Sequence, residues 1–99
     1  MNVDFDMVLG FAKTLEGRDL YTQARQRLFR VGVIGDMLEY TPASTREART
    51  DGRKTIEQVL ARYRVTQSLK PCDYQDATFN ASYLLTIVAL MVGSEDRSE

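Results

Sequence analysis

The sequence predicts a mainly helical α+β domain that carries one β-hairpin, with its elements in the order helix, helix, hairpin, helix, helix. Three observations predict this fold class: apolar residues at helical spacing, a Gly35-Asp36 pair between two runs of strand-forming residues, and a long apolar run near the carboxyl end. An entirely helical domain is the alternative, in which the second helix continues through Val31. Because 99 residues with 43% hydrophobic content suffice for one core but not for two, we expect a single domain over residues 1–99.

The first helix is expected over residues 4–16. Asn2 and Asp4 can each cap its start. Gly17 ends it, because glycine accepts the left-handed conformation that follows many helices. The residues that share its apolar face are Phe5, Val8, Leu9, Ala12 and Leu15.

A second helix is expected over residues 20–29, with Asp19 as its cap. Its apolar positions recur at four-residue steps, at Leu20, Ala24 and Leu28. The competing interpretation is a strand over residues 20–22, since aromatic and β-branched residues favour sheets. Three residues count for less than a ten-residue pattern, so the sequence favours the helix.

The hairpin turns at Gly35-Asp36, because glycine at the first central position of the turn adopts a positive φ without steric cost. A two-residue loop at this point determines the register of the strands. The predicted partners are Ile34 with Met37, Val33 with Leu38, Gly32 with Glu39, Val31 with Tyr40, and Arg30 with Thr41. One face of the hairpin is then apolar and must pack on the helices. Pro42 cannot donate a ladder hydrogen bond and should end the second strand.

Residues 43–53 are polar and rich in arginine and threonine, so we expect them to form a long surface loop. A third helix is expected over residues 55–66. Thr55 and Gln58 fit a capping box at its start.

The last helix is expected to begin near Asp76 or Asn80 and to end at about Val92, after a connection over residues 68–76. It is apolar at nearly every position from Tyr83 onward. A helix that is apolar on all sides must be buried on all sides. It therefore lies either in the core of the monomer or against another subunit.

The composition argues against several kinds of functional site. The chain has no histidine and one cysteine, so the usual zinc sites, the serine and cysteine triads and the haem attachment motif each lack a required residue. Cys72 is expected to be an inert thiol, and Asp73 and Asp76 are expected to be turn or cap residues. We therefore expect a protein that is not an enzyme and holds no metal or cofactor. With no apolar run of roughly 20 residues and no secretion signal, we also expect a cytoplasmic protein that does not enter a membrane.

The charges are unevenly distributed, although the formal net charge is only -1. Residues 25–70 hold ten basic and five acidic side chains, whereas residues 71–99 hold one basic and five acidic. Eight of the ten central cations are arginines, which bind phosphate or carboxylate through paired donors. The residues predicted to form a polyanion-binding surface are Arg25, Arg27, Arg30, Arg46, Arg49, Arg53 and Lys54. The alternative is a solvated surface whose cations pair with the acidic ends of the same chain.

The predicted function is a non-enzymatic interaction module whose arginine-rich centre binds nucleic acid or an acidic protein. Stacking on bases needs exposed aromatic rings, and Tyr21 and Tyr74 are the expected candidates because Tyr40 and Tyr63 lie on apolar faces. The alternative function is a structural or regulatory protein that forms a homodimer through its apolar last helix.

Overall fold

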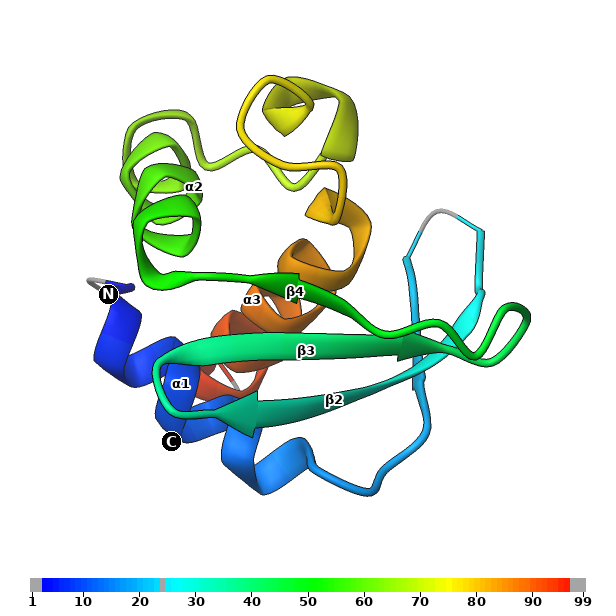
Figure 1. Cartoon of the computed structure of the whole chain (residues 1–99). Helices are drawn as coiled ribbons and strands as arrows, with labels where there is room; N and C mark the ends of the chain where they lie inside the picture. Colours follow the sequence, from blue (N-terminus) through cyan, green and yellow to red (C-terminus); the bar gives the residue numbers. More distant parts are fainter. Residues whose placement is uncertain (1–2, 24, 97–99) are drawn as a thin grey trace.

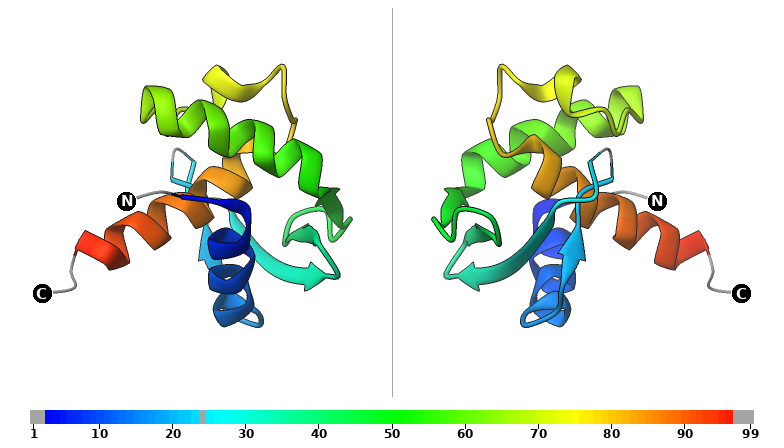
Figure 2. Two further views of the ribbon diagram at one scale, coloured as in Figure 1. Left: turned by 90° about the vertical axis from the view of Figure 1, so that its left-hand side faces the viewer. Right: turned by 90° about the vertical axis from the view of Figure 1, so that its right-hand side faces the viewer.

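A four-stranded antiparallel sheet with helices on one face makes up the fold. The computed structural model describes residues 3–23 and 25–96. In chain order the elements are α1 (Phe5–Leu15), β1 (Leu20–Tyr21), β2 (Leu28–Ile34), β3 (Met37–Pro42), β4 (Arg49–Asp51), α2 (Arg53–Thr66), the short 3₁₀-helix η1 (Pro71–Tyr74) and α3 (Ala81–Asp96). The strand order in the sheet is β1-β2-β3-β4. Figure 1 shows α1 and α3 behind the sheet and α2 beyond its β4 edge, and the side views in Figure 2 show the same layering.

The predicted order helix, helix, hairpin, helix, helix is wrong, because β1 and the start of β2 stand where the second helix was predicted. Ala24, part of that predicted helix, lies outside the described residues. Burial alternates from Leu20 to Gln23, which is the two-residue period of a strand. Leu20 pairs with Phe29, so the chain folds back on itself within ten residues. The competing interpretation of a strand here was the better one, and the all-helical alternative is also wrong.

The predicted hairpin and its register are confirmed. All five predicted pairs are present, and a sixth pair joins Phe29 to Pro42, at which β3 ends. Gly35 has a φ of 61°, the positive value for which the turn requires glycine. The inner face of the hairpin is apolar, and Val31, Leu38 and Tyr40 on it are buried.

The surface loop predicted over residues 43–53 is interrupted by β4, whose three residues pair with β3. Asp51 at its end is buried, and Gly52 alone connects it to α2. The helix therefore begins at Arg53 and not at Thr55. The predicted capping box is wrong, because Thr55 already lies inside the helix.

The helices close the core from one side. The carboxylate of Asp4 accepts the Met7 N–H at 2.9 Å and caps α1, while Asn2 lies outside the described residues. The helix α3 begins directly after Asn80, one of its two predicted starts, and continues to Asp96, beyond the predicted end. Its buried residues are Ala81, Leu84, Leu85, Thr86, Ile87, Val88 and Met91. Apart from Thr86, these side chains belong to the core of the monomer, and Leu90 is a large apolar residue on α3 that stays 42% exposed.

Candidate functional site

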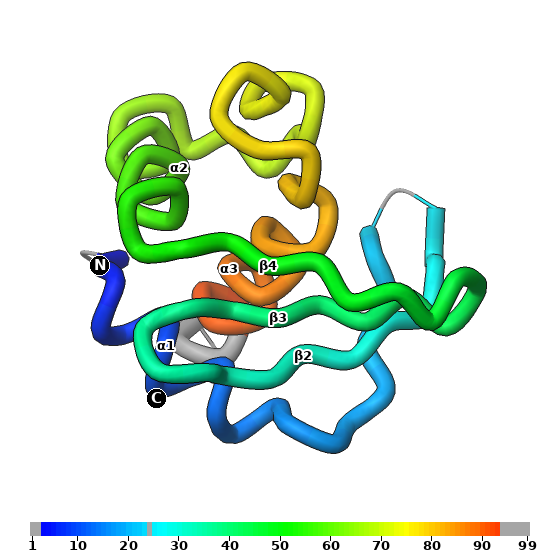
Figure 3. The backbone as a smooth tube through the Cα atoms, viewed as in Figure 1, coloured from blue at the N-terminus to red at the C-terminus, as the bar shows by residue number. Residues whose placement is uncertain are grey.

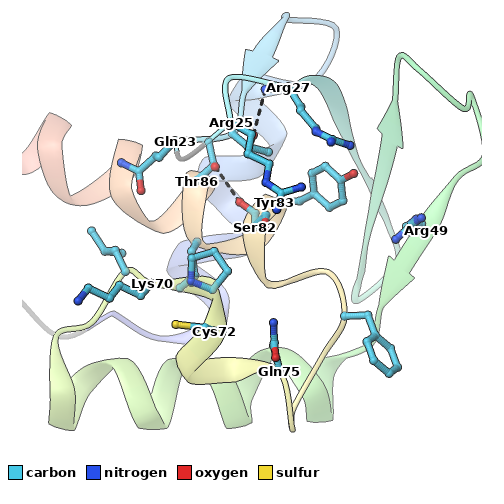
Figure 4. Close-up of a pocket in the computed structure, with 15 residues that line it drawn as sticks. Gln23, Arg25, Arg27, Arg49, Lys70, Cys72, Gln75, Ser82, Tyr83 and Thr86 are labelled. Carbon is cyan, nitrogen blue, oxygen red and sulfur yellow. Dashed lines mark hydrogen bonds between the residues drawn. The ribbon is translucent and has the colours of Figure 1, made fainter.

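A pocket of about 770 Å³ opens between the β1–β2 turn, β4, the segment around η1 and the first turns of α3. Four cationic side chains line it, namely Arg25, Arg27, Arg49 and Lys70. No aspartate or glutamate is among the described residues that line it. Figure 4 shows Arg25 and Arg27 on the turn, Arg49 on β4 and Tyr83 between them, while the Lys70 side chain runs outward at the far end of the pocket.

The turn between β1 and β2 positions the first two arginines. The Thr22 N–H donates to the carbonyl of Arg27 at 3.0 Å, and the Arg27 N–H donates back to the Thr22 hydroxyl at 3.0 Å. The Gln26 N–H donates to the Thr22 carbonyl at 2.9 Å, and Gln26 adopts a positive φ of 53°. Because Thr22 is buried, these bonds fix the base of the turn, while Arg25 and Arg27 stay exposed above it. The tube in Figure 3 shows this part of the chain, in cyan, standing at the right-hand end of the sheet.

Arg49 precedes a buried polar network at the end of β4. The Asp51 side chain, which is 4% exposed, accepts hydrogen bonds from the Tyr40 hydroxyl at 3.0 Å, the Thr78 hydroxyl at 2.8 Å and the Asn80 amide at 3.2 Å. Burial raises the pKa of Tyr40 well above its ordinary value, and the neighbouring Asp51 raises it further. Asp51 is therefore anchored by three donors, and Arg49 lies two residues before it on the same strand.

Lys70 is positioned by a turn that leads into η1. The Lys70 N–H donates to the Ser68 hydroxyl at 3.2 Å, and the Lys70 carbonyl accepts the Asp73 N–H at 3.0 Å. The Ser68 hydroxyl in turn donates to the Asp73 carboxylate. The backbone of Lys70 is thus fixed while its ammonium group stays exposed.

The aromatic residues of the pocket differ in how free their rings are. The Tyr83 ring stacks on Tyr40, with 5.5 Å between ring centroids, and contacts Phe29 at 4.9 Å. The Phe79 side chain, by contrast, is 91% exposed. Phe79 is therefore the ring with free faces at this site.

Sequence reasoning missed Phe79 and left Lys70 out of the predicted set. Phe79 comes two residues before α3, a position from which an apolar residue usually packs against the fourth residue of the helix, here Leu84. That rule predicts a buried ring, so no pattern in the sequence marks Phe79 as exposed. Of the two rings expected to be free, Tyr21 is 51% exposed, but Tyr74 is buried and its hydroxyl donates to the Ser68 carbonyl at 2.7 Å.

The seven predicted cations do not all lie together. Arg25, Arg27 and Arg49 line the pocket, and none of them forms an ion pair with an acidic residue in the described part of the chain. Two others are paired: Arg30 bonds Asp19 at 3.1 Å, and Arg53 bonds Glu57 at 3.2 Å. The remaining two, Arg46 and Lys54, are exposed and do not line the pocket.

Two further cations of the central segment are also engaged elsewhere. Arg62 donates to both carboxylate oxygens of Asp76, and these bonds lower the pKa of Asp76 and raise that of Arg62. Arg64 donates to the Val3 carbonyl at 2.6 Å. Four cations therefore line one pocket without an ion pair in the described part of the chain: Arg25, Arg27, Arg49 and Lys70.

Comparisons with known proteins give no family for this chain: no protein-family model, no curated protein and no solved structure matches it. Within residues 3–23 and 25–96, no cluster of three or more cysteine, aspartate or glutamate residues is placed to hold a metal ion. Among the described helices, none combines the length and apolar composition needed to cross a membrane. Any function must therefore be argued from the pocket itself.

Proposed function

We propose that this protein is a non-enzymatic interaction module that binds nucleic acid through the pocket lined by Arg25, Arg27, Arg49 and Lys70, hereafter the basic pocket. The observation that carries the proposal is the gathering of these four side chains, from three separate segments, around one concave surface. A cleft lined by one sign of charge focuses the electrostatic field and concentrates ions of the opposite sign. A cytoplasmic location fits this proposal, since nucleic acid is abundant there.

Like charges that share a pocket repel one another, so an anion bound between them relieves this repulsion. In the described part of the chain, carboxylates neutralise Arg30, Arg53 and Arg62 but none of the four side chains of the basic pocket. Three of the four are arginines, whose planar guanidinium groups match phosphate oxygens with two donors each. The chain thus carries local positive charge despite its formal net charge of -1.

The pocket favours nucleic acid over an acidic protein because it also presents an aromatic ring. Phe79 lines the same pocket and is almost fully exposed. Carboxylates of an acidic protein gain little from such a ring, whereas each nucleic-acid base has a flat face that stacks on it. Nucleic acid therefore uses both features of the site, because its phosphates contact the cations and its bases contact the ring.

Fluorescence anisotropy with a labelled oligonucleotide tests the proposal. The test variant replaces Arg25, Arg27 and Arg49 by glutamine. Its matched control replaces Lys13, Arg18 and Lys54 by glutamine, which removes the same charge from exposed positions outside the pocket. Each phosphate contact adds about 0.7 to the slope of log affinity against log salt for a single strand, so the test variant should lower the slope by about 2.

The control variant should keep both the affinity and the salt slope close to those of the wild-type protein. If the two variants behave alike, binding does not depend on the basic pocket and the proposal is wrong. If a poly-glutamate peptide displaces the oligonucleotide at equal charge concentration, the pocket serves an acidic protein instead of nucleic acid. Circular dichroism of each variant checks that the fold is kept.

A further inference from the structure

We infer that the basic pocket takes an unpaired nucleotide, so that the protein selects single-stranded over double-stranded nucleic acid, with the Phe79 ring as the platform on which a base stacks. This inference rests on the proposed function and adds the class of nucleic acid to it. It depends on how Phe79 is exposed, on what holds it there, and on which partner such a ring accepts.

Phe79 is exposed although the residues on both sides of it are buried. Thr78 and Asn80 are buried polar residues, while the ring between them is 91% exposed. A phenylalanine at a free surface forgoes the burial that this side chain normally gains on folding. The Phe79 ring lines the pocket and is not covered by the monomer, so both of its faces are open to a ligand.

The Asp51 network fixes the backbone on both sides of the ring. Asp51 Oδ1 accepts from the Thr78 hydroxyl at 2.8 Å and from the Asn80 amide at 3.2 Å. The Asn80 N–H donates to the Thr78 hydroxyl at 3.0 Å, and its side-chain amide also bonds the Thr50 carbonyl at 3.3 Å. The segment that carries Phe79 is thus tied to β4, the strand that carries Arg49. A base on the ring and a phosphate on the guanidinium group meet a preorganised site, which lowers the cost of ordering it on binding.

The free ring selects an unpaired base. In a duplex the faces of each base are covered by its stacked neighbours, so a base becomes available to a protein ring only where it is unstacked. Tyr83 does not compete for the base, since its ring already packs on Tyr40 and Phe29. The pocket volume of about 770 Å³ lies within the range of roughly 300–1,000 Å³ that is usual for small-ligand sites, large enough for one nucleotide.

Three fluorescein-labelled probes of about 12 nucleotides separate stacking from charge: an oligothymidylate, a duplex hairpin, and an abasic strand with the same phosphates but no bases. Anisotropy titrations should give the tightest binding to the oligothymidylate. Phe79→Ala should weaken that binding roughly 5- to 150-fold, the loss expected for one base–aromatic stack, and should leave binding to the abasic strand unchanged. Phe79→Trp should restore it. The control is Val65→Ala, which truncates another apolar side chain, 84% exposed on α2, and should have no effect.

The outcomes distinguish this inference from the proposed function. If the abasic strand or the duplex binds as tightly as the oligothymidylate, or if Phe79→Ala binds like the wild-type protein, phosphate contacts alone hold the ligand. The inference is then overturned while the proposed function stands. If none of the three probes binds, the proposed function is overturned and this inference with it.

Discussion

The hydroxyl of Tyr40 offers a sharp test of the buried network around Asp51 at the end of β4. It donates to Asp51 Oδ2 at 3.0 Å, and both side chains are buried. Tyr40→Phe keeps the ring and its stack on Tyr83 and removes only the O–H group. A hydrogen bond to a charged group contributes about 1.5–3 kcal/mol, and Asp51 keeps its other two donors. We expect a loss of about 2 kcal/mol in the free energy of unfolding, which for a domain of this size lowers Tm by roughly 8–16 °C.

Urea unfolding at neutral pH and thermal melts, both followed by circular dichroism, measure this loss. Two other tyrosines provide matched controls. Tyr21→Phe changes an exposed side chain and should alter the free energy of unfolding by less than about 0.5 kcal/mol. Tyr74→Phe removes a bond to the neutral carbonyl of Ser68 and should cost about 1 kcal/mol. If Tyr40→Phe costs no more than Tyr21→Phe, the Asp51 network does not stabilise the fold and the reasoning is wrong.

Three other predictions concern pH and backbone conformation. Burial raises the pKa of Tyr40 above its ordinary value near 10, so the stability it adds is fully present below about pH 10 and is lost as the pH rises further. Urea unfolding should show the difference between wild type and Tyr40→Phe shrinking above that pH, and a constant difference would count against this. Gly10→Ala, in open space on α1, should raise the free energy of unfolding by about 0.5–1 kcal/mol. Gly35→Ala, at a φ of 61°, should lower it by about 1 kcal/mol. If urea unfolding shows that both substitutions change stability in the same direction, this prediction is wrong. Because hydrogen bonds from Arg62 lower the pKa of Asp76, an NMR titration of that carboxyl should move toward its ordinary value in Arg62→Gln, and an unmoved midpoint would disprove the assignment.

The hairpin could be predicted from the sequence because its register depends on local rules. Gly35 determines where the chain turns, and every pair follows from that one position. Residues 20–29 were mispredicted because their four-residue apolar spacing is also compatible with two short strands. Pairing of Leu20 with Phe29 decides between the two, and that contact is tertiary.

β4 could not be predicted, since Arg49, Thr50 and Asp51 include no apolar residue. β4 forms because the edge of β3 opposite β2 can pair with a further strand. Its end is fixed by Thr78 and Asn80, which follow α2 in the chain and donate hydrogen bonds to Asp51. The same limit applies to the site. The excess of cations was visible in the sequence, but which of them meet depends on the β1–β2 turn and on β4. Phe79 also lines the pocket, and it lies in a connecting segment without helical or strand periodicity.

Glu16 lies at the edge of the sheet, where a strand of another molecule could pair with β2. Since β1 has only two residues, the far end of β2 has no neighbouring strand on the β1 side, and there the Glu16 carboxylate accepts the Val33 N–H at 2.9 Å. A backbone amide already bonded to a carboxylate is not available to a strand from another molecule, and the negative charge repels an approaching chain. Ile34 beside it is exposed and β-branched, the kind of residue that promotes intermolecular sheets. One acidic side chain at the end of α1 thus occupies a backbone donor on which a strand of another molecule would otherwise pair.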